Sequence, residues 1–343
     1  MFTKNNSNLI SVFIGLIVGV GGFYFYMQRF NQVSVANDKT YKVAVLIPAV
    51  HPSMDQIENG FADTLKKVIP AVKVDIFNAS GNKVLMKGLA QEIVEKNYDI
   101  AFAVGTGASQ MLKASIDKFY TDNGSNNKRL PLVFAAVSDP VAAGLVDENK
   151  MVTGVIDQYD FNDQIELLML LKKVKKPLLV YDSNSNQAFE KQVKDIEKVF
   201  ASYDAHLTVV PVSHINEVYQ KVSGVINGHD LIMTLTDHTI CSAMDSLVKL
   251  CSTHGITLFT SELDSNAKGA ALSYGVNERD YGVQAAEQVL ESLVDRKEIA
   301  EIPVRIISPF YIKINKATAS LQGLNISKEQ FNLYEKVQVQ KGN

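Results

Sequence analysis

Residues 42–68 read KVAVLIPAVHPSMDQIENGFADTLKKV, and this stretch contains the unit from which most of the chain is built. Val43–Ile47 is a short apolar run that ends at Pro48, as expected of a buried strand. Within 55–68, apolar residues recur at the spacing of one helix face. The stretch therefore predicts a buried strand, a polar connection and an amphipathic helix.

The same unit recurs along the chain. Further apolar runs predict strands at 72–77, 100–104, 132–137, 178–181, 207–212, 231–235, 257–260 and 270–274. Helical spacing predicts helices at 84–96, 108–119, 161–172, 187–202, 215–226, 240–251 and 281–294. Nearly all-apolar strands that alternate with helices indicate parallel sheets with helices on both faces. We therefore expect an α/β fold with two doubly wound parallel-sheet lobes of about five strands each.

Composition limits the class of protein. The 343 residues are 46% hydrophobic and 21% charged, which is typical of a globular chain and not of a disordered one. At about 150 residues per domain, this length suits two lobes and an appendage. The net charge of -3 provides no basic surface for a phosphate backbone, so nucleic acid is not an expected partner.

The first 40 residues contain a signal for membrane insertion. Residues 5–28 carry no charge, and Leu9 to Tyr26 are long and apolar enough to cross a bilayer core of about 30 Å as a helix. This run exceeds the core of about 7–15 residues in a cleaved signal peptide, which favours an uncleaved single-pass anchor. Ser34-Val35-Ala36 keeps cleavage open as the alternative. Either way, we expect the folded part outside the cytoplasmic membrane, with residues 326–343 as a polar tail.

Signatures of catalysis and metal binding are incomplete. Gly105-Thr106-Gly107 follows a predicted strand, but Gln110 stands where a dinucleotide fingerprint has its third glycine. The sequence has no Walker-type Gly-Lys-Ser/Thr, no Gly-x-Ser-x-Gly elbow and no His-Glu-x-x-His. Cys241 and Cys251, if both lie on the predicted helix 240–251, are about 15 Å apart and too distant for a disulfide. We expect ligand binding without chemistry, and neither a cofactor nor a metal.

Polar residues follow most of the predicted strands. A single Ser, Thr, Asp or Asn before a helix is usually an N-cap, but ligands of doubly wound sheets bind beyond the carboxyl ends of the strands. Several of these segments also open helices, whose backbone N–H groups favour an anion. A ligand with a carboxylate and an ammonium group suits such an edge. The polar segments are 48–53, 105–109, 138–140, 182–186, 236–239, 261–262 and 274–277.

Six stretches in a particular order carry a resemblance: 51–55, 78–82, 134–146, 153–155, 236–239 and 269–282. The most specific is 134–146, FAAVSDPVAAGLV. Together they resemble the tryptophan/tyrosine-type substrate-binding proteins of bacterial ABC transporters, over about residues 42–326. The resemblance implies a periplasmic-binding-protein fold, in which two α/β lobes close about a hinge on a small ligand. It places lobe I at 41–156 plus 276–306, and lobe II at 157–275 plus 308–325, the last segment containing a strand and a helix.

The resemblance also implies a set of ligand contacts. Backbone amides at helix starts would bind a carboxylate, Asp139 or Asp237 would pair with an ammonium group, and Tyr274 or Tyr281 would stack on an apolar side chain. His238 stands where the family commonly has Asn. The complete set of expected contacts is Thr106, Gly107, Ser138, Asp139, Asn184, Thr236, Asp237, His238, Thr239, Tyr274, Asn277 and Tyr281.

The resulting expectation is the extracytoplasmic binding component of an ABC-type importer. Its ligand is expected to be an amino acid, with an aromatic one among the candidates, and its protein partner an ABC permease. The alternative is a membrane-tethered sensor of the same fold that signals to a membrane partner. A periplasmic enzyme on this scaffold is disfavoured by the missing motifs.

Overall fold

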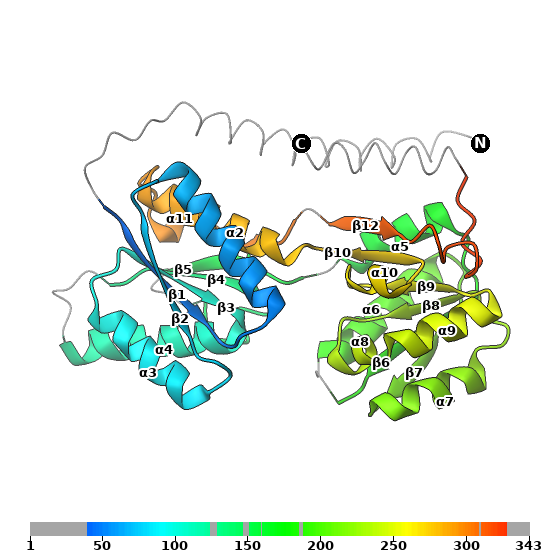
Figure 1. Cartoon of the computed structure of the whole chain (residues 1–343). Helices are drawn as coiled ribbons and strands as arrows, with labels where there is room; N and C mark the ends of the chain where they lie inside the picture. The colour runs from blue at the N-terminus through cyan, green and yellow to red at the C-terminus, as the bar shows by residue number, and fades with distance from the viewer. Residues whose placement is uncertain are drawn as a thin grey trace. The chain divides into compact units, whose positions relative to one another are not determined.

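The computed structural model describes residues 40–123, 129–146, 151–158, 160–184, 188–308 and 310–327. These residues form two compact units, one from 40–157 and 278–307 and the other from 158–277 and 308–327 (Figure 1). The predicted membrane segment at 9–26 and the predicted tail beyond residue 327 lie outside the described residues. Within the described ranges, no helix has the length and apolar character needed to span a bilayer.

The first unit contains a parallel six-stranded sheet in the order β11-β5-β4-β3-β1-β2. Its strands are β1 (Lys42–Ile47), β2 (Lys73–Asn78), β3 (Ile100–Val104), β4 (Leu132–Val137), β5 (Val152–Ile156) and β11 (Arg305–Ile306). Helices α3 (Lys83–Glu95) and α4 (Gly105–Asn123) cover one face, and α2 (Pro52–Val68) and α11 (Glu278–Leu293) cover the other (Figure 1). A short 3₁₀ turn, η1 (Ile299–Glu301), precedes β11.

The second unit repeats this plan with the order β12-β10-β9-β8-β6-β7. Its strands are β6 (Pro177–Asp182), β7 (Thr208–Val212), β8 (Leu231–Thr234), β9 (Thr257–Thr260), β10 (Leu272–Gly275) and β12 (Tyr311–Ile314). Its helices are α5 (Phe161–Leu171), α6 (Ala188–Ser202), α7 (Ile215–Val225), α8 (His238–Ser242), α9 (Met244–His254) and α10 (Ser265–Lys268). One apolar cluster lies under α5 and α6 and another under α7 to α9, so helices cover both faces.

The predicted α/β class with two mainly parallel sheets is confirmed, and all of the predicted strands are present. Each sheet has six strands where about five were expected. The strands β5 and β11 were not predicted, whereas β12 lies in the segment 308–325, for which the resemblance implied a strand. The one departure from parallel pairing among the described strands is at the edge of the second sheet, where β12 runs antiparallel to β10. The helix implied near 308–325 is absent, because residues 316–323 form turns after β12.

The predicted helix 240–251 is two helices, α8 and α9, which meet at Ala243. Ala243 leaves the helical region of backbone space (φ -93°, ψ 5°), so the chain changes direction there. Cys241 and Cys251 therefore lie on different helices, and both are free thiols. Burial raises the pKa of both thiols, to about 11 for Cys241, as expected of cysteines in apolar surroundings.

Two glycines allow α2 and α11 to pack with their backbones in contact. A Cβ atom on Gly60 would lie 2.2 Å from the carbonyl oxygen of Arg279, and one on Gly282 would lie 1.9 Å from that of Ile57. Both separations are far below van der Waals contact, so only glycine fits at either position. Beneath this crossing, Phe61 of α2 stacks on Phe102 of β3 with ring centroids 4.1 Å apart.

The turns after β12 are joined to the second sheet by one side chain, the fully buried Gln322. Its Oε1 accepts hydrogen bonds from the backbone N–H groups of Leu258 (3.2 Å) and Ala271 (3.1 Å). Its Nε2 donates to the carbonyl oxygen of Gly269 (2.9 Å) and to Ser252 Oγ (3.3 Å). The carboxamide therefore pairs buried backbone groups of β9 and of the segment just before β10.

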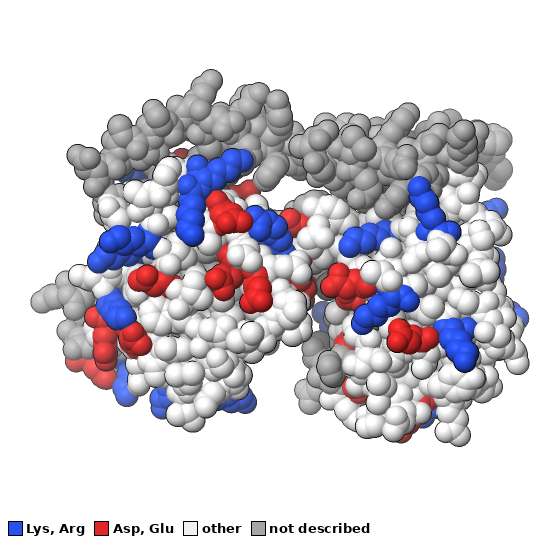
Figure 2. Space-filling model, in the orientation of Figure 1, with Lys and Arg blue, Asp and Glu red and all other residues white. Residues whose placement is uncertain are grey.

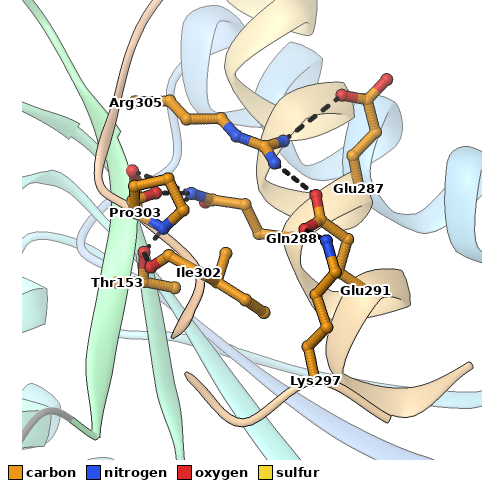
Figure 3. Close-up of polar contacts among 9 residues, drawn as sticks. Thr153, Glu287, Gln288, Glu291, Lys297, Ile302, Pro303 and Arg305 are labelled. Carbon is orange, nitrogen blue, oxygen red and sulfur yellow. Dashed lines mark hydrogen bonds and ion pairs between the residues drawn. The ribbon is translucent and has the colours of Figure 1, made fainter. Parts of the chain in front are cut away.

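Polar contacts also join α11 to the segment that leads into β11 (Figure 3). Gln288 Nε2 donates to the carbonyl oxygens of Pro303 (3.0 Å) and Gly154 (3.2 Å). Arg305 forms ion pairs with Glu291 and, at 3.9 Å, with Glu287. Burial raises the pKa of Glu287 to about 7, although Arg305 opposes the shift.

Glu287 should make the stability of the first unit depend on pH. Its carboxyl has an ordinary pKa of 4.5, so the folded protein holds its proton more tightly than the unfolded chain between pH 4.5 and about 7. The contribution of this carboxyl to the free energy of unfolding therefore falls as the pH rises through that window. Glu287→Gln should remove this fall. Between pH 5 and pH 8, the free energy of unfolding of the variant should therefore rise relative to that of the wild type by up to about 3 kcal/mol.

Urea denaturation across this pH range measures the effect. Glu298→Gln, at an exposed position just after α11, is the control and should keep the wild-type pH profile. If the profiles of Glu287→Gln and the wild type run parallel, the carboxyl of Glu287 is already ionised at low pH and the prediction is wrong.

Candidate ligand-binding edges

The topology identifies the place in each sheet where a ligand is expected. The strand order reverses between β1 and β3 in the first unit, and between β6 and β8 in the second. At such a switch point the connections leave the sheet in opposite directions and open a crevice beyond the carboxyl ends of the strands. The tips of β3 and β8 carry Thr106, Gly107 and the segment 236–239, which are among the predicted contacts.

In the first unit, α4 begins directly at the end of β3. Gly105 has a positive φ of 79°, a conformation that glycine adopts without strain, and it turns the chain into the helix. Thr106 and Gly107 follow in the first helical turn, and both are exposed. Their position gives this edge a helix N-terminus, where backbone N–H groups favour a carboxylate.

Ser138 and Asp139 follow β4, the next strand of the same sheet, and both are exposed. Asp139 Oδ1 accepts hydrogen bonds from the backbone N–H groups of Val141 (3.0 Å) and Ala142 (2.9 Å). Asp139 therefore caps the turn after β4 and places a carboxylate at the edge. Gln110 of α4 donates to the carbonyl oxygen of Ala143 (3.0 Å), so the loop after β4 lies beside α4.

In the second unit, Asp237 connects the tips of β6 and β8. Its Oδ2 accepts from the backbone N–H of Asp182 (3.1 Å), and its Oδ1 accepts from that of Ile240 (2.7 Å), so Asp237 caps α8. Asp182 in turn accepts from the Thr239 hydroxyl and from the backbone N–H of Asn184 (2.8 Å). Burial raises the pKa of Asp237, and both of its oxygens are engaged within the protein. Its position is that of a buried support for the edge.

Thr236 is exposed at the same edge, and its hydroxyl donates to the carbonyl oxygen of Ser261 (3.0 Å), which follows β9. Asn184 is also exposed there. The structure thus brings together Asn184, Thr236, Asp237 and Thr239 around the tips of β6, β8 and β9. His238 is the first residue of α8, but its side chain lies outside the described part of the structure.

The remaining predicted contacts lie on β10, on α11 and between them. Tyr274 is buried at the end of β10, where its ring stacks on Phe310 with centroids 5.1 Å apart, and burial raises the pKa of its hydroxyl. Tyr281 is buried in α11, and its hydroxyl donates to Asp157 Oδ1 (2.6 Å) just after β5. Asn277 is partly buried between β10 and α11. The roles assigned to these residues from the sequence stay predictions.

Gln164 is a polar residue at this end of the second sheet that the sequence reasoning passed over. It lies in α5, is fully buried, and donates through Nε2 to Ser261 Oγ (2.9 Å). A signal was present, since Gln164 stands between Phe161 and Leu168 on the apolar face of a predicted helix. A polar side chain at a core position of this kind requires a partner or a function.

Charged side chains of both signs are interspersed on the surface that Figure 2 shows, in keeping with the small net charge. Within the described ranges, no group of three or more His, Cys, Asp and Glu side chains is arranged to hold a metal ion.

Comparison with known proteins gives a consistent result. A family model described as ABC transporter substrate binding protein matches residues 42–337. A protein named tyrosine-binding protein from Clostridioides difficile (strain R20291) is 26% identical over 286 residues, covering 81% of this chain and 79% of the relative. A crystal structure of an ABC domain in complex with L-Trp from Streptococcus pneumonia has a TM-score of 0.64 and 25% identity, covering 86% of this chain and 98% of that one.

A further solved structure supports the fold. It is the ligand-free, open form of a substrate binding protein with adhesive properties from Clostridium difficile. Its TM-score is 0.73 at 22% identity, with 85% of this chain and 97% of that chain covered.

Proposed function

The chain belongs to the family of ABC transporter substrate-binding proteins, and from this premise we propose that it is the extracytoplasmic binding component of an importer for an aromatic amino acid. The observation that carries the proposal is the match of the family model to residues 42–337, which include every described element. The tyrosine-binding relative and the L-Trp complex support an aromatic ligand. We propose that the protein binds its ligand without transforming it and delivers it to an ABC permease.

The edge of the first unit suits the common groups of an amino acid. The start of α4 offers backbone N–H groups at Thr106 and Gly107 for the carboxylate. Of the two aspartates considered for the ammonium group, Asp139 is exposed, whereas Asp237 is buried with both oxygens engaged. We assign the ammonium contact to Asp139. The apolar segment at 9–26 would hold the protein at the outer side of the cytoplasmic membrane.

Thermal unfolding against a panel of the twenty amino acids, small peptides and sugars tests the proposal. A ligand at about 100 times its dissociation constant should add about 2.7 kcal/mol to the free energy of unfolding. We expect this stabilisation from tyrosine, tryptophan or both, and none from sugars. No stabilisation by any amino acid would contradict the proposed ligand class.

Asp139→Asn separates recognition from stability in the same assay. The amide oxygen of Asn can still accept from Val141 and Ala142, and Asn and Asp cap helix starts about equally well. The variant should therefore keep its melting temperature without ligand and lose at least about tenfold in affinity, because a charged hydrogen bond to the ammonium group is lost. Unchanged affinity would remove Asp139 from the site.

A further inference from the structure

Gln164 and Gln322 are both fully buried in the second unit, but their carboxamides are used differently. Gln322 pairs both ends of its carboxamide with two groups each. Gln164 makes its hydrogen bond through Nε2 to Ser261 Oγ, and its Oε1 is buried without a hydrogen-bond partner among the described residues. A buried carbonyl oxygen without a partner lowers stability, so its presence calls for an explanation other than folding.

Other buried polar atoms without a partner lie in different surroundings. Gln288 Oε1 is one of them, but its Nε2 joins α11 to the backbone at Gly154 and Pro303, which is sufficient reason for a glutamine there. His229 Nδ1 lies before β8, at the end of the sheet away from the switch point. Gln164 instead contacts Ser261, at the carboxyl end of β9, and the Ser261 carbonyl accepts from Thr236. It is thus attached to a residue of the candidate edge.

The residues packed around this part of α5 indicate what kind of donor would suit the unpaired Oε1 of Gln164. Phe161, one turn before Gln164 on the buried face of α5, belongs to an apolar cluster that also contains Leu235, just after β8, Phe259 of β9 and Tyr274 of β10. A neutral amide oxygen beside apolar side chains suits a neutral donor better than an ammonium ion, whose burial without a carboxylate is costly. An aromatic side chain that carries an O–H or N–H group has both the apolar body and the donor.

We propose that Gln164 determines ligand specificity by accepting a hydrogen bond through Oε1 from the O–H or N–H group of an aromatic ligand side chain. Ser261 Oγ orients the carboxamide by accepting from Nε2. The proposal rests on the proposed function and sharpens it: the protein selects tyrosine or tryptophan and rejects phenylalanine. Phenylalanine would leave the buried oxygen unpaired, and a site built around such a hydrogen bond discriminates strongly against a ligand that lacks it.

The first test uses ligands on the unmodified protein, so it does not depend on how any variant folds. Titration calorimetry compares tyrosine with phenylalanine, and tryptophan with 3-benzothienylalanine, in which sulfur replaces the indole N–H. We expect the donor-bearing member of at least one pair to bind about tenfold to hundredfold more tightly. The pair that shows the difference identifies the donor as phenol O–H or indole N–H. Equal affinities within both pairs would overturn the role of Gln164 and leave an aromatic ligand in place.

The second test is Gln164→Met, which keeps the length of the side chain and removes its polar atoms. The variant should lose the preference for the donor-bearing ligand, keep or improve its affinity for phenylalanine, and melt at or above the wild-type temperature. Gln322→Met is the matched control for stability and should melt well below the wild type. A wild-type ratio of tyrosine to phenylalanine affinity in Gln164→Met would overturn the proposal, as would an equal loss of both affinities with a lowered melting temperature.

The two levels of the argument fail separately. If the unmodified protein binds none of the four aromatic ligands, the assigned ligand class is wrong and the inference falls with it. If it binds them but Gln164→Met discriminates as before, only the role of Gln164 is wrong.

Discussion

Gly282→Ala should destabilise the first unit by about 3 kcal/mol or more, although it adds a single methyl group. That methyl group would lie 1.9 Å from the carbonyl oxygen of Ile57 and 2.6 Å from the backbone nitrogen of Phe61. Backbone atoms cannot rotate away as a side chain does, so α2 and α11 must separate by more than 1 Å, roughly, to restore van der Waals contact. Overpacking of this kind usually costs about 1–3 kcal/mol, and a clash with helix backbone belongs at the upper end.

Differential scanning calorimetry measures this effect, and for units of this size the loss corresponds to a fall of about 6–12 °C in melting temperature. Gly88→Ala is the matched control, because it makes the same chemical change in the interior of α3 with no atom within 4 Å of the new Cβ. It should stabilise the protein by about 0.5–1 kcal/mol, since alanine favours helix over glycine. If Gly282→Ala lowers the free energy of unfolding by only about 1 kcal/mol or less, the two helices adjust to the methyl group at little cost and the prediction is wrong.

Gln322→Met should have an effect of similar size in the second unit. The substitution preserves the volume of the side chain. It removes the hydrogen bonds that Gln322 forms with the N–H groups of Leu258 and Ala271 and with the carbonyl oxygen of Gly269. Each buried backbone group left without a partner costs about 1–3 kcal/mol, so we expect a loss of at least about 3 kcal/mol. The turns after β12 should then detach from β9 and β10 before the rest of the unit unfolds.

Urea denaturation gives the free energy, and hydrogen exchange at Leu258 and Ala271 locates the loss. Leu321→Met is the control, since Leu321 is 61% exposed on the same turn and its change should stay within about 0.5 kcal/mol. If Gln322→Met matches this control, water replaces the lost hydrogen bonds and Gln322 is not a structural support.

Hydrophobic periodicity in the sequence was sufficient to predict most helices and strands, but not the short strands β5 and β11 of the first sheet. The strand β5 was missed because Thr153 and Gly154 interrupt its apolar run, and Gly154 is required since a Cβ there would lie 2.3 Å from the carbonyl oxygen of Phe134. The strand β11 is only Arg305–Ile306, and it exists through pairing with Val155 and Ile156. Contacts between distant segments created these strands, and no local pattern specifies such contacts.

The edges of the sheets were predictable to a similar degree. Topology rules place segments such as 236–239 at the carboxyl ends of the strands, and the structure has them there. The difference in burial between Asp139 and Asp237 was not predictable. Asp237 is buried through its contact with the backbone of Asp182, which is 55 residues away in sequence. The order of the elements in the sequence was enough to locate the edge. Tertiary contacts decide which residues there are buried supports, such as Asp237, and which are exposed candidate ligand contacts, such as Asp139.

The late return of the chain to both sheets sets an order for synthesis and folding. The partner of Ile156 in the first sheet is Ile306, so the entire second unit up to Asn277 must be made before the first sheet is complete. The second sheet gains its last strand only when residues 311–314 emerge and pair with β10. Closing so long a loop delays these pairings relative to local helix formation. Both units therefore remain incomplete during synthesis until residues 305–314 have been made.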